Sequence, residues 1–274
     1  MDMLDAHFIA AVLGATVGMA LGLTGAGGGV LALPALMLGL GFSFSEARQV
    51  AFMAVGAAAL LGALEGMRQG LVRYKAALLM AAAGSLISPL SLQLAQALPA
   101  TVMTTGFCLL MLYLAQRMAR QALKDRKNRR GPQETCVPCS MSPATGRLRW
   151  SVACARSLGL VGAAAGACSG MFGVGGGFLI VPGLKRVSDV SMHGIVATSL
   201  AVIALISTSG VVAAYANGTH VSRLGLLFIL GAVIGLMSGR RLAPAISGAR
   251  LQLGFAAAQA LLAVGLLIHM LQGR

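Results

Sequence analysis

Charged residues are scarce in this chain of 274 residues. They make up 10% of it, and only 7 of them are Asp or Glu. An average soluble domain carries about 25% charged residues, so this chain has too few charges to cover a surface exposed to water. Hydrophobic residues account for 57%. The composition excludes an ordinary soluble globule and predicts an integral protein of the lipid bilayer.

The basic residues are not spread as in a nucleic-acid-binding protein, although they give a net charge of +14. Ten of the 21 Lys and Arg lie between Arg117 and Arg156, and most of the others stand in short gaps between apolar runs. This distribution is typical of the cytoplasmic loops of membrane proteins. We therefore expect no nucleic acid among its partners.

Two features of secreted proteins are also missing. The N-terminus lacks the positive region of a signal peptide, because Asp2 and Asp5 make it negative. We therefore take it as the start of the first membrane segment. The five cysteines form no secreted disulfide framework. We expect Cys108, Cys154 and Cys168 to be free and to act as small hydrophobic residues in or beside apolar segments.

Eight apolar segments follow one another along the chain. Two of them, residues 8–41 and 152–184, are too long for one straight crossing, since 33 residues of helix measure about 50 Å. Each contains a glycine cluster at mid-length, which predicts two shorter half-helices joined by a break. The other six have the roughly 20 residues that span a bilayer. They are residues 47–67, 72–92, 98–118, 190–215, 221–239 and 249–271.

The two halves of the chain form an internal repeat. Residues 19–34, MALGLTGAGGGVLALP, match residues 167–182, ACSGMFGVGGGFLIVP, at a spacing of 148 positions. Glycines elsewhere in the halves keep this spacing. The fold class is therefore expected to be all-α, a multi-pass transmembrane bundle of two homologous four-segment repeats. The expected divisions are residues 1–118 (first repeat), 119–150 (basic linker) and 151–274 (second repeat).

The charge distribution favours inverted repeats over parallel ones. If each long segment crossed once, the repeats would be parallel, and basic loops of the second half would lie opposite the linker. If each long segment instead enters and returns as a re-entrant pair, 18 basic residues share the cytoplasmic side with the linker. The positive-inside rule favours this arrangement, which is common in transporters. The basic residues left outside are Arg48, Arg223 and Arg274.

The glycines serve two purposes. Those repeated every fourth residue share a helix face and are expected to pack membrane helices closely: Gly14, Gly18, Gly22, Gly162, Gly166 and Gly170. Consecutive glycines instead break a helix, and the N–H groups of the next half-helix then face the break. Two such breaks near the mid-plane would bind an anion, the alternative being structural kinks. The substrate-binding glycines would be Gly25, Gly27, Gly28, Gly29, Gly173, Gly175, Gly176 and Gly177.

No lysine follows either glycine cluster, so neither is a Walker phosphate loop. A dinucleotide fingerprint needs a preceding strand, whereas a glycine-spaced membrane helix precedes each cluster. We therefore expect no nucleotide, and the sequence indicates no cofactor, no metal site and no catalytic residue.

Hydroxyl side chains stand near the breaks and in one crossing. Thr24 and Ser169 flank the glycine clusters, and Thr198 and Ser199 belong to the densest group of hydroxyls in any apolar segment. A hydroxyl can bond a desolvated oxyanion without adding charge. The alternative is hydrogen bonding within and between helices. We include these four residues in the expected substrate site.

The pair GLTGAGGGVLALP and GMFGVGGGFLIVP, with a basic loop between four-segment halves, resembles the TauE/SafE family of sulfite and organosulfonate exporters. Residues 195–218, IVATSLAVIALISTSGVVAAYANG, are similar to the second-half helix of that family. The first half departs from it, since residues 50–61 lack a Thr-Ser pair. The resemblance implies a bacterial inner-membrane transporter for small sulfur-containing anions, with the linker in the cytoplasm.

Other polar residues have simpler explanations. Glu65 lies within four residues of Arg68 and reads as interfacial, and His269 lies near the C-terminus. His193, beside Asp189, is a candidate for coupling protons to transport, but loop histidines seldom have this role. The motif CVPC, at residues 136–139, supplies only two of the four ligands of a structural zinc site.

The sequence thus predicts a secondary transporter, and not an enzyme, that exports a small anion by alternating access. Sulfite or an organosulfonate is the expected substrate, and a homodimer the candidate oligomer. Two alternatives stay open. One is a membrane sulfur-relay or redox protein that uses Cys136 and Cys139, and the other is a non-transporting scaffold that docks through the linker.

Overall fold

The structure is a computed structural model. It describes residues 3–25, 28–127, 139, 151–188, 190–216, 222–242 and 248–272. Secondary structure within these ranges is helical, apart from an isolated bridge between Cys139 and Ser188. The all-α prediction is therefore confirmed.

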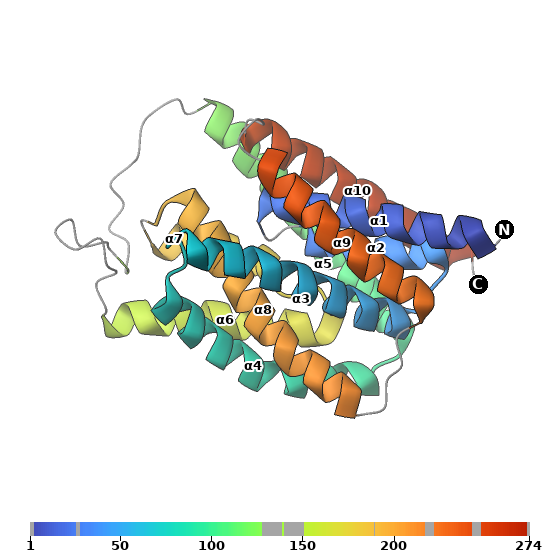
Figure 1. The fold of residues 1–274 in the computed structure, drawn as a ribbon, viewed down its shortest axis with the longest axis horizontal. Helices are drawn as coiled ribbons and strands as arrows, with labels where there is room; N and C mark the ends of the chain where they lie inside the picture. The colour runs from blue at the N-terminus through green and yellow to red at the C-terminus, as the bar shows by residue number, and fades with distance from the viewer. Residues whose placement is uncertain are drawn as a thin grey trace.

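Ten helices are described, in two sets of five (Figure 1). The first set is α1 (Met3–Thr24), α2 (Gly29–Leu40), α3 (Phe44–Arg68), α4 (Tyr74–Ala97) and α5 (Ala100–Lys127). The second set is α6 (Val152–Phe172), α7 (Gly177–Val187), α8 (Met192–Ala216), α9 (Arg223–Leu242) and α10 (Gly248–Gln272).

Seven helices in the described ranges are long and apolar enough to cross a membrane. They are α1, α3, α4, α5, α6, α9 and α10, whereas α2 and residues 192–208 of α8 form shorter apolar stretches. These lengths and compositions are those of a multi-pass membrane protein.

Each of the two long apolar segments is broken, but not into equal parts. The first helices, α1 and α6, have 22 and 21 residues, whereas α2 and α7 have 12 and 11. The expectation of shorter half-helices therefore holds only for the second member of each pair. The first member ends where Gly25 and Gly173 adopt φ angles of 77° and 68°. Glycine takes this left-handed conformation without the steric penalty that other residues meet.

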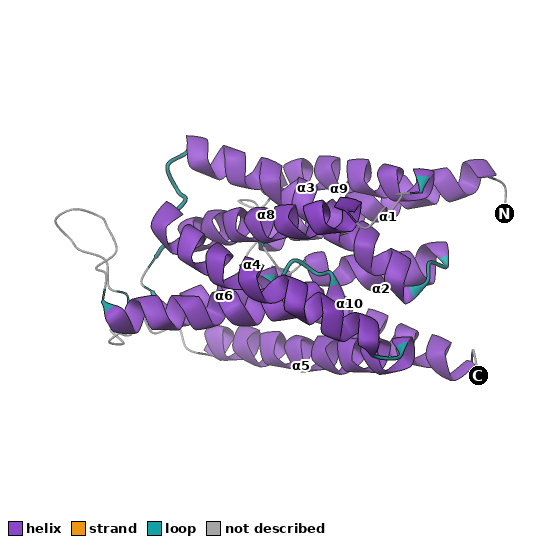
Figure 2. Ribbon diagram, turned by 90° about the horizontal axis from the view of Figure 1, so that it is seen from below, coloured by secondary structure: helices purple, strands orange, loops and turns teal. Residues whose placement is uncertain are grey.

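The short helix of each pair folds back along the long one. Gly39 of α2 lies against Leu13 of α1, and Gly183 of α7 lies against Val161 of α6. The chain leaves α2 near the end at which α1 began, and both termini lie at that end of the molecule (Figures 1 and 2). How these hairpins sit in a membrane stays a prediction.

The glycines spaced by four residues pack helices of opposite halves against one another. α1 packs mainly on α9, and α6 packs mainly on α4. A Cβ atom on Gly18 would lie 1.9 Å from the carbonyl oxygen of Ala232, and one on Gly166 would lie 2.2 Å from that of Gly84. The two contacts are related by the 148-residue spacing of the repeat. Only glycine permits such close approach, as small residues do in membrane helices.

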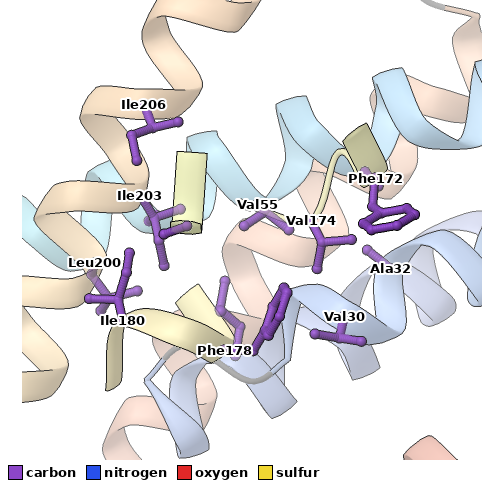
Figure 3. Packing of buried hydrophobic residues seen from close by; sticks show 14 of the residues in the cluster. Val30, Ala32, Val55, Phe172, Val174, Phe178, Ile180, Leu200, Ile203 and Ile206 are labelled. Carbon is purple, nitrogen blue, oxygen red and sulfur yellow. The ribbon is translucent and has the colours of Figure 1, made fainter. Parts of the chain in front are cut away.

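The remaining helices pair symmetrically across the molecule, with α3 against α8 and α5 against α10. Apolar side chains from these helices meet around the two breaks, where Val55, Val174 and Ile203 lie close together (Figure 3). Phe172, at the end of α6, packs on Phe107 of α5 with ring centroids 5.4 Å apart. The breaks therefore stand in the apolar core of the bundle.

Candidate functional site

The two helix breaks meet in the structure. A Cβ atom on Gly29 would lie 2.8 Å from the carbonyl oxygen of Val174. The side chain of Val55 packs against both breaks. It would lie 3.2 Å from a Cβ atom on Gly29 and 2.8 Å from one on Gly175. Val55, Val174 and the neighbouring Phe178 fill the space beside the breaks (Figure 3). The breaks are thus closed against each other in this conformation.

At the first break, two of the expected hydroxyls hold backbone groups. The Ser199 hydroxyl lies 3.2 Å from the Gly25 carbonyl oxygen and 2.8 Å from that of Val196, and can donate to either. The Thr24 hydroxyl donates to the Ala20 carbonyl at 2.7 Å and accepts from the Gly28 N–H at 3.2 Å. Thr24 therefore satisfies one of the donors left free where α2 begins.

At the second break, the expected hydroxyl is that of Ser169, and it makes no hydrogen bond to a described residue. The Gly173 N–H donates to the backbone carbonyl of Ser169 at 2.8 Å. The Ser169 hydroxyl is 1% exposed and has no hydrogen-bond partner among the described residues. The left-handed residues Gly175 and Gly176 lead into α7. A buried hydroxyl without a partner marks a place where a water or ligand atom would be stabilised.

Thr198 lies elsewhere. Its hydroxyl accepts a hydrogen bond of 3.1 Å from the N–H of Arg73, the residue just before α4. It also borders a small cavity beside Ser188. The structure therefore groups Thr24, Gly25 and Ser199 at one break but does not bring Thr198 to them. Gly27 lies outside the described residues.

A cavity of about 80 Å³ opens beside the first break. Thr24 forms part of its wall, and Arg117 of α5 and Lys185 of α7 bring two positive charges to it. Gln259 of α10 also lines it and is fully buried. Apolar side chains complete the wall: Leu114, Met118, Phe178, Val181, Pro182 and Met192.

Gln259 is the most informative of these residues. Neither its side-chain nitrogen nor its side-chain oxygen has a hydrogen-bond partner among the described residues. A buried amide without partners costs about 1–3 kcal/mol, so a ligand or water in the cavity would be held by it. Together with the two cations, it makes the cavity suitable for an oxyanion that carries an apolar group.

Sequence reasoning missed Arg117, Lys185 and Gln259 as site residues. Both cations were counted as loop charges, because each stands at the end of an apolar segment. Gln259 gave a usable signal, since a polar side chain inside a predicted span is a functional candidate. Their convergence on one cavity could not be read from spacing, because they come from three separate helices.

Glu65 and the histidines differ in their surroundings. Glu65 pairs with Nε of Arg240 at 3.3 Å and not with Arg68, and the same arginine donates to the Gly62 carbonyl. This ion pair joins α3 to α9. His193 and His269 are exposed, and Asp189 lies outside the described residues.

The cysteines differ from the sequence expectation. Cys154 is not free but forms a disulfide with Cys139. The Cys139 N–H also donates to the Val187 carbonyl at 3.0 Å, so Cys139 is joined to the start of α6 and to the end of α7. Cys108 and Cys168 are free, as expected. Cys136 lies outside the described residues, and no three His, Cys, Asp or Glu side chains within those residues are placed to hold a metal ion.

Comparisons with known proteins agree with this architecture. The family model described as "Sulfite exporter TauE/SafE" matches residues 10–266. Two proteins from Xylella fastidiosa, strains Temecula1 and 9a5c, are each described as "Probable membrane transporter protein". They are 28% identical to this chain over 243 and 242 residues, which cover 86% of this chain and 85% of theirs. No solved structure matches. Since the family model covers nearly the whole chain, the protein belongs to the TauE/SafE family and is a membrane transporter.

Proposed function

We propose that this transporter exports a small sulfur oxyanion, sulfite or an organosulfonate, across the bacterial inner membrane, and that linker 119–150 lies in the cytoplasm. The observation that carries the proposal is the cavity that Arg117, Lys185 and the buried Gln259 line together. Two cations and an amide donor match the oxygens of a sulfonate or sulfite group. The apolar wall matches the carbon part of an organosulfonate.

The helix breaks supply the moving part in this proposal. The N–H groups of Gly25 to Gly29 and of Gly173 to Gly177 bind the anion once the breaks separate, with Thr24, Ser169 and Ser199 in support. Thr198, whose hydroxyl bonds the Arg73 N–H, would take part only after a rearrangement of α8. Two facts favour this role. Thr24 belongs to both the cavity wall and the first break, and short helices that begin at mid-membrane breaks direct their positive ends at anions in transporters.

Transport into or out of proteoliposomes tests the proposal. We expect wild-type protein to carry sulfite or methanesulfonate and not a cation of similar size. Arg117→Gln and Lys185→Gln should each weaken apparent affinity by about tenfold, because each removes one charge-assisted contact. The matched controls are Arg120→Gln and Arg186→Gln, which change neighbouring charges that do not line the cavity.

Two results would contradict the proposal. One is a wild-type protein that moves no sulfur oxyanion at any concentration tested. The other is equal loss of transport in the cavity variants and their neighbouring controls, which would point to surface charge alone. Gln259→Leu gives an independent check. Leucine has nearly the volume of glutamine but no polar atoms, so this variant should also bind the anion with lower apparent affinity.

A further inference from the structure

Arg48 is a buried cation at the second helix break. It lies on α3, one turn after the helix begins, and is only 7% exposed. A Cβ atom on Gly173 would lie 2.5 Å from Cγ of Arg48 and 2.5 Å from its carbonyl oxygen. The stem of this arginine therefore rests on the glycine that ends α6.

No described residue neutralises this charge. Glu46, the acid nearest to it in sequence, is bonded to Ser43 in the capping box that begins α3. Glu65 is paired with Arg240. Neither a hydrogen bond nor an ion pair joins the Arg48 side chain to the part of the chain that the structure describes. An arginine whose side chain is mostly buried and has no partner is unfavourable, and a bound anion would offset that cost.

The first break shows that packing does not require the charge. Val196 occupies the position equivalent to Arg48, 148 residues further on, and rests on Gly25 in the same way, with Cγ1 2.3 Å from where a Cβ atom would stand. The position equivalent to Ser169 is Leu21. The first break is therefore apolar where the second carries an arginine and a hydroxyl.

The polar side chains of the second break include a donor that is not in use. The Ser169 hydroxyl is buried and has no partner among the described residues, and its backbone carbonyl holds the Gly173 N–H. Arg48 and Ser169 thus flank the same glycine, one from α3 and one from α6. A guanidinium and a hydroxyl together suit an oxyanion.

Neither member of this pair lines the cavity. Gly173 precedes the first turn of α7, whereas Lys185 lies in its last turn, about 12 Å along the helix from Gly177. The start of α3 lies toward the end of the molecule that holds both termini (Figure 1). An anion held at Arg48 would therefore occupy a different place from one held between Arg117 and Lys185.

We propose that Arg48 and Ser169 form a second oxyanion site, at which the exported anion binds after it has passed the breaks. As a step in export this rests on the proposed function, but as an anion site it stands alone. It assigns different tasks to the two breaks: the second holds an anion at Arg48 and Ser169, and the first borders the cavity.

The test is anion-dependent thermal stabilisation of the purified full-length protein, with sulfite, sulfate and methanesulfonate as probes. The background is Arg117→Gln/Lys185→Gln, which weakens the cavity. We expect the double variant to keep part of the anion-dependent rise in Tm. The triple variant, which also carries Arg48→Val, should lose that part. Arg48→Val should fold, because Val196 shows that valine fits this contact. Its Tm without anion should be equal or higher, since a buried charge is removed.

Arg223→Gln is the matched control, because it removes an exposed charge from the same predicted side, and it should keep the full response. Arg48→Lys should retain a weaker response. The proposal would be overturned if anions stabilised the double variant equally with and without Arg48→Val. It would also be overturned if no probe anion stabilised the wild-type protein. Absence of transport, with the Arg48-dependent stabilisation present, would refute export and leave the anion site standing.

Discussion

The hydroxyl of Ser199 on α8 lies 3.2 Å from the carbonyl oxygen of Gly25, the residue that ends α1. This contact joins residues from opposite halves of the chain at the left-handed glycine of the first break. It also explains why a hydroxyl stands in the apolar segment at this position.

Replacement of Ser199 by Ala should loosen the first break. The Gly25 carbonyl would lose its side-chain donor, and we expect the free energy of unfolding to fall by about 1 kcal/mol. The thermal midpoint in detergent measures this change. Ser238→Ala is the control, because its hydroxyl bonds within its own helix at 3.1 Å and its loss should change little.

Alanine at Gly166 should disrupt the contact between α6 and α4. Its Cβ atom would lie 2.2 Å from the Gly84 carbonyl oxygen, so the helices must separate, at a cost of about 1–3 kcal/mol. Gly159 on the same helix has open space around it. Gly159→Ala should leave the protein as stable or raise its stability by up to about 1 kcal/mol. Equal behaviour of the two variants would contradict the packing.

Reduction of the Cys139–Cys154 disulfide should release the linker from α6 and α7. A loop of 15 residues predicts a loss of about 3 kcal/mol. We expect dithiothreitol to lower the Tm of the wild-type protein and of Cys168→Ala but not that of Cys139→Ser. Cytoplasmic proteins rarely keep disulfides, so if the linker faces the cytoplasm, thiol trapping in growing cells should find Cys139 reduced. An oxidised Cys139 in such cells would contradict our placement of the linker.

Loss of Arg240 should affect stability more than loss of its partner. Glu65 is half exposed, and an exposed ion pair contributes less than about 1 kcal/mol. Arg240 also donates to the Gly62 carbonyl, so Arg240→Gln removes two contacts between α3 and α9. The thermal midpoint should therefore fall most in Arg240→Gln, less in Glu65→Gln and least in Arg241→Gln, which changes an exposed neighbour.

The sequence predicted the helices well because membrane spans depend on local composition. The start of α3 could also be read locally, since Ser43 and Glu46 stand three residues apart and form a capping box. Arg48 could not. Hydropathy places it at the edge of a span and counts it as a loop charge, whereas in the structure it is buried and lies against the distant Gly173. The cavity was missed for the same reason, because its polar residues belong to helices that meet only in three dimensions.

The glycine contacts between opposite halves bear on how the chain is made. Ribosomes deliver α1 and α4 long before α9 and α6, the helices on which they pack. The narrow glycine faces of the first half must therefore remain against lipid or the insertion machinery until the second half arrives. Each half therefore covers the glycine faces of the other.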